Sequence, residues 1–186
     1  MEIPYDLFKE YIGPYCSRQS LGRISCTCIA MKYILHKDLE SRRFRPTNRT
    51  IREAVGDYLN RKKYGHISGW DVSNVTNMMF LFHSMLDFNE DLSKWDVSQV
   101  KYMYGMFSNA ISFNGDLSEW NVSNVIDMGI MFDNAKSFNG DISGWNVNNV
   151  KDFRNMFWNT IKFNPKNAPW YFKFLSTKDY QFREQN

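Results

Sequence analysis

The chain has 186 residues, a formal net charge of +3 and an aromatic content of 17%. This length is enough for one hydrophobic core, or for a repeat stack with a small additional domain. No stretch reads as a transmembrane run, and the acidic, polar start lacks the basic and apolar regions of a secretory signal. These features predict an intracellular, cytoplasmic protein without a membrane partner, located in the host cytoplasm or the virion if it is viral.

The basic residues are concentrated near the N-terminus. Residues 1–62 contain 12 Lys+Arg and 7 Asp+Glu, whereas the remainder contains 11 and 13. The basic cluster consists of Arg42, Arg43, Arg45, Arg49 and Arg52. Nucleic-acid binding would need exposed aromatic residues or a known reading module beside it, so a solvated linker or a docking patch for an acidic partner is favoured. The cysteines, Cys16, Cys26 and Cys28, are odd in number and favour buried, reduced thiols over a zinc site.

Residues 1–40 are predicted to form an α-helical head of two or three short helices. The first helix carries apolar residues at helical spacing, Leu7, Phe8, Tyr11 and Ile12, and Gly13-Pro14 ends it. A second apolar pattern between Leu21 and Leu35 predicts a longer amphipathic helix or a bent pair. One interpretation of the head is a cap that shields the first coil of the repeats that follow.

With Ile3-Pro4-Tyr5-Asp6-Leu7 at its start, and Ile12, Leu21, Ile24, Cys28 and Met31 after it, the head also resembles an F-box. That motif opens with Leu-Pro-x-Glu/Asp-Leu, which Ile3-Pro4-Tyr5-Asp6-Leu7 matches except at Ile3. Gly13-Pro14 and Met31 also depart from the usual pattern. The resemblance implies docking on a Skp-type adaptor of a cullin–RING ubiquitin ligase. The residues that would form this contact are Pro4, Leu7, Ile12, Leu21, Ile24 and Met31. The cap and the F-box remain alternative interpretations.

Residues 41–63 read as a basic linker followed by a capping helix. Thr50-Ile51-Arg52-Glu53 is a capping box, with Thr50 as the N-cap residue and Glu53 reaching back. The apolar face of the following helix consists of Ile51, Ala54, Val55, Tyr58 and Leu59. We expect this helix to cover the open end of the first coil, because repeat stacks require capped ends.

Residues 64–169 repeat with a period of 25 residues. The period is clearest in the tryptophans Trp70, Trp95, Trp120, Trp145 and Trp170. In one copy, Leu92-x-x-Trp95-x-Val97 has the spacing of a leucine-rich-repeat strand, and Ser98 stands at a helix N-cap position. The helix after it would bury Val100, Met103, Met106, Phe107 and Ala110. The repeats therefore predict an α/β solenoid, with leucine-rich-repeat-like coils of one short strand and one short helix.

The segment FNGDLSEWNVSNVIDMGIMF, Phe113 to Phe132, resembles the BspA-like leucine-rich-repeat family, whose 25-residue repeat also occurs in mycoplasma lipoproteins. The aromatic, Asn, Asp, Trp, Val and Met positions of the motif are filled in three successive copies, and the repeats cover more than half of the chain. The resemblance implies protein–protein contact rather than catalysis. It does not identify a partner.

Polar residues also recur once per coil. The row Asp91, Asp116 and Asp141 could bind calcium, although capping of backbone amides is favoured, with the row of Asn89, Asn114, Asn139 and Asn164 forming a hydrogen-bonded ladder. A second row is expected to face outward and to bind a protein partner: Asp71, Lys94, Asp96, Glu119, Asn121, Asn146 and Tyr171. Neither row pairs a nucleophile with a base, so we expect no enzyme and no cofactor. Lys166 and His66 replace Asp at the two ends of the first row, so we expect no metal.

Residues 170–186 are predicted to form a C-terminal cap, with Trp170 to Leu175 in the strand position, and a polar tail. The sequence as a whole predicts a non-catalytic protein–protein interaction module. It could serve as an F-box-type substrate adaptor of a ubiquitin ligase. The alternative is a structural component of a larger assembly, such as a virus particle, in which the head acts only as a cap.

Overall fold

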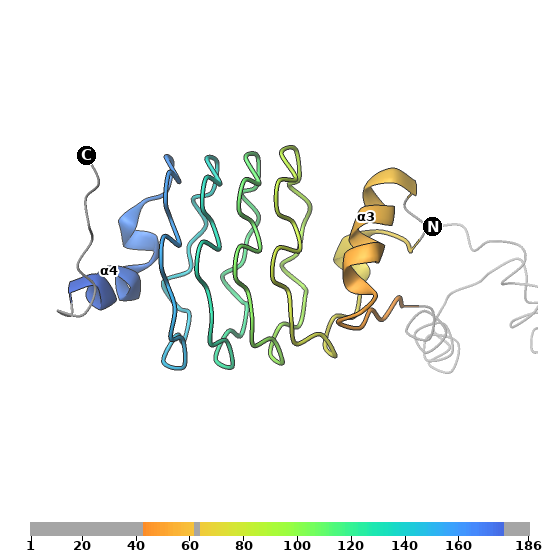
Figure 1. Ribbon diagram of the computed structural model, residues 1–186, viewed down its shortest axis with the longest axis horizontal. Coiled ribbons are helices and arrows are strands. Elements are labelled where there is room, and N and C mark those ends of the chain that lie inside the picture. Colours follow the sequence, from red (N-terminus) through yellow and green to blue (C-terminus); the bar gives the residue numbers. More distant parts are fainter. Residues whose placement is uncertain (1–42, 62–63, 177–186) are drawn as a thin grey trace, which may run out of the picture. The chain divides into compact units, whose positions relative to one another are not determined.

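The structure is a computed structural model that describes residues 43–61 and 64–176 (Figure 1). The chain divides into two compact units, Met1–Arg43 and Phe44–Asn186. The predicted helical head, with its candidate adaptor contacts, therefore lies outside the described residues. These contacts are Pro4, Leu7, Ile12, Leu21, Ile24 and Met31.

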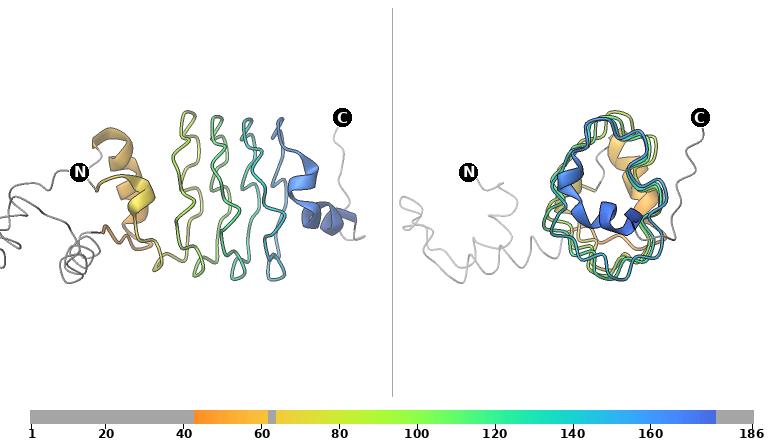
Figure 2. Two further views of the ribbon diagram at one scale, coloured as in Figure 1. Left: turned by 180° about the vertical axis from the view of Figure 1, so that it is seen from behind. Right: turned by 90° about the vertical axis from the view of Figure 1, so that its left-hand side faces the viewer.

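The second unit is a stack of coils between two helices. Helix α3 (Ile51–Arg61) and the short 3₁₀ helix η4 (Ile67–Gly69) precede the stack, the 3₁₀ helix η5 (Pro165–Asn167) lies at the end of its last coil, and helix α4 (Pro169–Ser176) follows. Viewed along the stack, the coils overlie one another (Figure 2). We number the coils 1 to 4, for residues 70–94, 95–119, 120–144 and 145–169.

The coils contain neither the strand nor the helix expected of an α/β solenoid, so that prediction of the fold class is wrong. Between η4 and η5, the described chain forms turns and isolated parallel bridges only. The bridges join Asn77 to Tyr102, Tyr102 to Asp127 and Asp127 to Asp152. Within coil 1, backbone N–H groups donate to carbonyls three residues earlier, as from Val75 to Val72 and from Leu81 to Met78. The apolar spacing of three residues, read as one face of a helix, is the spacing of these consecutive β-turns.

The distance between coils explains why they are not helical. Equivalent phenylalanines stack with ring centroids 5.4 Å apart between Phe82 and Phe107, and 5.6 Å apart between Phe107 and Phe132. Two α-helices cannot approach closer than about 8 Å. Each coil must therefore be thin, and a chain of tight turns satisfies this requirement.

Backbone hydrogen bonds join each coil to the next. The N–H groups of alternate residues in coil 1 donate to carbonyls in coil 2: Met78 to Tyr102, Phe80 to Tyr104, Phe82 to Met106 and Ser84 to Ser108, over 2.8–2.9 Å. This arrangement requires a left-handed backbone conformation, with positive φ, at two positions per coil. In coil 1 these are Phe80, with φ of 56°, and Ser84, with φ of 58°. Asn or Gly occupies five of the six equivalent positions in coils 2 to 4, as a left-handed turn position favours.

The interior is a column of aromatic rings tied to the backbone. The indole N–H groups of Trp95, Trp120, Trp145 and Trp170 each donate to a backbone carbonyl 28 residues earlier, as from Trp95 to the Ile67 carbonyl (2.9 Å) and from Trp120 to the Leu92 carbonyl (3.0 Å). Phe107 and Phe113 also stack within one coil, 4.0 Å apart. The Trp, Phe and Met side chains of coils 2 and 3 are buried, so these layers contact one another on both sides.

Helix α3 covers the first coil, as the sequence predicts (Figure 1). Its residues Ile51, Ala54, Val55 and Tyr58 are at most 1% exposed. The predicted capping box differs, because the Thr50 hydroxyl accepts a hydrogen bond from the Thr47 N–H, 2.9 Å away, outside the helix. The edge of coil 1 is closed by two side chains. The Asn48 amide oxygen accepts the N–H groups of Thr76 and Asn77, and the Arg52 guanidinium donates to the Met79 carbonyl at 2.6 Å.

The C-terminal cap is helical, whereas the sequence predicted a strand position for it. Helix α4 begins at Pro169, whose fixed φ suits the first turn of a helix. Trp170 still stacks on Trp145, with ring centroids 6.3 Å apart. Tyr171 packs edge-on against Phe157 at 4.9 Å. The cap therefore keeps the tryptophan of a fifth coil but replaces the coil itself with a helix.

We expect Trp120→Ala to lower the free energy of unfolding by about 3–5 kcal/mol, because it opens a cavity in a central coil and leaves the Leu92 carbonyl without its donor. Glu119→Ala, an exposed neighbour, should change it by less than about 0.5 kcal/mol. Urea denaturation of both variants measures the difference. Similar losses would mean that the column of rings does not carry the stability of the stack.

Candidate functional site

The predicted partner-binding row has a structural role at four of its positions. Side-chain oxygens of Asp71, Asp96, Asn121 and Asn146 each accept the N–H of the residue two positions later, over 3.0–3.3 Å. Ser98, expected as a helix N-cap acceptor, is therefore the donor in this turn. Asp71 also forms an ion pair with Arg45, 2.9 Å away. These residues fix the geometry of one turn per coil.

The three other members of the row behave differently. Lys94 and Glu119 are exposed, as predicted. Tyr171 is only 5% exposed, because it lies in α4 and packs against the last coil. It therefore does not belong to an outward-facing row.

The second polar row caps turns and forms the predicted ladder. Asp91, Asp116 and Asp141 accept N–H groups from Ser93, Ser118 and Ser143, over 2.9–3.0 Å. The side-chain oxygen of each ladder asparagine accepts the backbone N–H of the next, from Asn89 through Asn114 and Asn139 to Asn164, over 2.8–2.9 Å. Within residues 43–61 and 64–176, no group of three or more His, Cys, Asp or Glu side chains is placed to hold a metal ion.

The turn hydrogen bonds also set the acidity of this row. The backbone and side-chain donors of Ser118 lower the pKa of Asp116, and those of Ser143 lower the pKa of Asp141. The hydroxyl and the N–H of Ser93 lower the pKa of Asp91 in the same way. The ionised form is favoured because it is the better acceptor of these bonds.

One row contains the residue types of a hydrolase triad, in the wrong arrangement. His83, Ser108 and Asp133 occupy equivalent positions in coils 1, 2 and 3. The Ser108 hydroxyl donates to Asp133 at 3.5 Å, whereas the His83 Nε2 pairs with the Ser84 hydroxyl at 3.1 Å. A triad requires the histidine between the nucleophile and the acid. Burial raises the pKa of Asp133, which is the reverse of what a permanently charged orienting acid needs.

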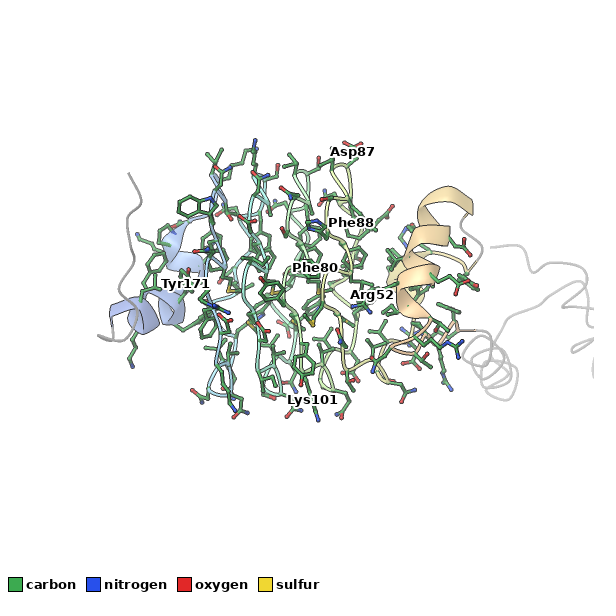
Figure 3. All side chains as sticks on the ribbon, viewed as in Figure 1. Arg52, Phe80, Asp87, Phe88, Lys101 and Tyr171 are labelled. Carbon is green, nitrogen blue, oxygen red and sulfur yellow. The ribbon has the colours of Figure 1, made fainter. Side chains whose placement is uncertain are left out.

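The strongest candidate for a binding surface is an exposed aromatic stripe, which we define as Phe80, Tyr102 and Tyr104 in coils 1 and 2. Phe80 is 44% exposed and Tyr102 is 38% exposed. Phe80 contacts Tyr104 edge-on, with ring centroids 5.3 Å apart. Figure 3 shows Phe80 between Asp87 of coil 1, at one end of the view, and Lys101 of coil 2, at the other.

Two glycines hold the rings of the stripe close to the backbone. A Cβ atom at Gly105 would lie 2.5 Å from Phe80 Cε1, and one at Gly129 would lie 2.9 Å from Tyr104 Cδ2. Each ring therefore lies close over a glycine of the next coil. The Arg52 side chain is bound at the carbonyl of Met79, the residue before Phe80. Aromatic residues and arginine are the side chains most enriched at the centres of protein interfaces.

A scan against protein-family models matches residues 51–183 to the Mycoplasma proteins of unknown function, DUF285. The match covers more than half of the chain. The chain belongs to this family. DUF285 is part of the group related to the BspA-like repeats, which confirms that part of the resemblance noted from the sequence. No curated protein and no solved structure matches the chain.

The DUF285 match begins at the first residue of α3 and includes the four coils and α4. It does not include the predicted head, residues 1–40. In the described part of this DUF285 chain, no helix is both long and apolar enough to cross a membrane.

Sequence reasoning did not identify the aromatic stripe. The signal was present, because Phe80 and Tyr102 break the repeat. The positions equivalent to Phe80 hold Gly105, Ile130 and Asn155, so an aromatic residue there serves no repeated packing role. A search for aromatic residues outside the conserved register of the four coils would have found the stripe.

We expect Asp116→Asn to weaken the dependence of thermal stability on pH. The folded-state pKa of Asp116 is lowered, so its contribution is present above the ordinary value of 3.8 and is lost as the pH falls through the lowered pKa. Asparagine keeps the acceptor oxygen without the titration, and Asp116→Ala removes both. Melting temperatures at pH 7 and at about pH 3 measure this. If wild type and Asp116→Asn lose the same stability on acidification, the turn does not set this pKa.

Proposed function

We propose that the chain is a non-catalytic protein-binding module, and that the coils hold a protein partner through the aromatic stripe. The observation that carries this proposal is the exposure of Phe80 at a backbone position that disfavours it. Phe80 has φ of 56° and is 44% exposed. A bulky residue with positive φ is an outlier that costs of order 1–3 kcal/mol, and such strain is typical of ligand contacts.

The surroundings of Phe80 also favour binding. Its ring is fixed by contact with Gly105 on one side and by the edge of Tyr104 on another. A fixed aromatic side chain loses little conformational entropy when a partner covers it, which favours affinity. The coil beneath it is held by hydrogen bonds from Phe80 and Phe82 to coil 2, so the stripe stands on a rigid support.

We expect Phe80→Asn to abolish capture of a partner without unfolding the chain. Asparagine tolerates positive φ, so the free energy of unfolding should change by less than about 1 kcal/mol. Leu86→Asn is the matched control, since Leu86 is an apolar residue of the same coil, 55% exposed, outside the stripe. The measurement is affinity capture with quantitative mass spectrometry. A partner retained equally by wild type and by Phe80→Asn would exclude the stripe as its site.

For the N-terminal head, we propose docking on a Skp-type adaptor of a cullin–RING ubiquitin ligase, with the coils holding the target protein. The support is the F-box resemblance of residues 1–40, in which Pro4 would set the entry to the first helix and Leu7 and Ile12 would supply apolar contacts. This role would place the protein in the cytoplasm.

Deletion of residues 1–40 should abolish co-purification with the adaptor and leave the coils folded, because α3 covers coil 1 independently. Circular dichroism of the truncated chain tests folding, and co-purification with the full-length chain tests docking. If the head is only a cap in a structural component of a larger assembly, full-length protein will retain no adaptor and the truncated protein will aggregate. A folded truncation, with no adaptor on the full-length chain, would contradict both roles.

A further inference from the structure

The two ends of the stack differ in their backbone hydrogen bonds. At the N-terminal end, Asn48 and Arg52 occupy polar backbone groups of coil 1 that face outward. At the C-terminal end, coil 4 is the last coil, so no further coil follows to accept hydrogen bonds from its N–H groups. The N–H groups of Asn155, Phe157 and Asn159 are equivalent to those of Phe80, Phe82 and Ser84. They find no acceptor in the part of the chain that the structure describes.

Large apolar side chains lie along this open edge. Trp158 is 62% exposed and stands between two of the unpaired N–H groups. Ile161, two residues after Asn159, is 71% exposed. Helix α4 packs on coil 4 through Tyr171, whose ring contacts the rings of Phe153 and Phe157. The edge therefore combines hydrogen-bond donors at alternate residues with apolar side chains between and beside them.

The charge of the chain reverses at this edge. Residues 70–144, coils 1 to 3, contain 3 Lys+Arg and 10 Asp+Glu. Residues 145–176, coil 4 and α4, contain 5 Lys+Arg and 1 Asp, and that aspartate, Asp152, forms an ion pair with Arg154 at 2.6 Å. The basic residues are all exposed: Lys151, Arg154, Lys162, Lys166 and Lys173. A terminal basic layer on an acidic stack complements an acidic ligand.

We propose that this edge binds an extended, acidic segment of a partner protein. Main-chain carbonyls of the segment accept the N–H groups of Asn155, Phe157 and Asn159, which continues the hydrogen bonding of the stack by one strand. Alternate side chains of the segment contact Trp158 and Ile161, and its carboxylates face the surrounding lysines. This site is separate from the aromatic stripe and does not rest on the function proposed for it.

Other occupants fit the edge less well. A second copy would have to present the outer edge of its own coil 1, which α3 covers and Asn48 and Arg52 occupy. In a tail-to-tail pair, the run from Asn155 to Asn159 would meet itself, donor against donor. Residues 177–186 of this chain contain two basic and two acidic residues, so they do not complement the basic edge.

The test is nuclear magnetic resonance of the ¹⁵N-labelled full chain with a synthetic peptide as the probe, acetyl-Glu-Val-Glu-Val-Glu-Val-Glu-amide. We expect saturable shifts of the Asn155, Phe157 and Asn159 amides and of the Trp158 indole, weakened by added salt. The peptide with lysine in place of glutamate should bind at least about tenfold more weakly. Ile161→Ser should lower the affinity for the acidic peptide severalfold. Leu86→Ser, the equivalent position in coil 1, should leave it unchanged.

Four outcomes overturn the proposal. The first is the absence of saturable shifts at these amides, and the second is equal binding of the acidic and basic peptides. The third is slow hydrogen exchange of the three amides in the free, dilute chain, which would assign the edge to the chain's own tail. The fourth is a dependence of their shifts on protein concentration, which would assign it to a second copy.

Discussion

The whole stack depends on the N–H groups that each coil donates to the next. In a solenoid built only from α-helices, the backbone groups bond within each helix and side chains alone join the layers. Here the backbone of coil 1 donates through Met78, Phe80, Phe82 and Ser84 to coil 2, so the layers are joined covalently along the chain and by hydrogen bonds across it. These bonds require close coils, and close coils permit the stacking of Phe82, Phe107 and Phe132. The aromatic column and the backbone ladder therefore depend on each other.

Such a ladder creates an edge problem at both ends. Unpaired backbone groups at an open edge invite pairing with other chains. At the start, Asn48, which precedes α3, contributes an amide oxygen, and Arg52 of α3 contributes a guanidinium, in place of the missing coil. At the end, α4 contributes Trp170, which fills the place of the next tryptophan but does not pair the donors of Asn155 to Asn159. At the N-terminal end of the stack, side chains form hydrogen bonds with the outer backbone groups of coil 1. At the C-terminal end, α4 packs on coil 4 but leaves the three N–H groups unpaired, so this end is the stronger candidate for binding a partner.

The sequence predicted the period, the buried positions, the asparagine ladder and the covering helix, because each depends on residue type at fixed spacing. The order of residues from Trp95 to Ala110 predicted which side chains are buried, but not the backbone conformation that buries them. A spacing of three residues satisfies a helix and a series of β-turns equally. The deciding residues were Gly105 and Asn109, which adopt positive φ and stop a helix in that segment. The aromatic stripe escaped notice for a related reason, since repeat analysis averages over copies and Phe80 and Tyr102 are exceptions to the average.

The repeat period of 25 residues determines how far the aromatic stripe lies from the open edge of coil 4. The stripe lies on coils 1 and 2, and the basic edge lies on coil 4. Because every coil offers its neighbours the same donors and acceptors, one whole coil could be inserted or removed between them without disturbing α3 or α4. Each such step would move the surfaces apart or together by roughly one ring spacing, 5.4–5.7 Å. The number of coils between the two surfaces therefore sets the distance between two bound ligands.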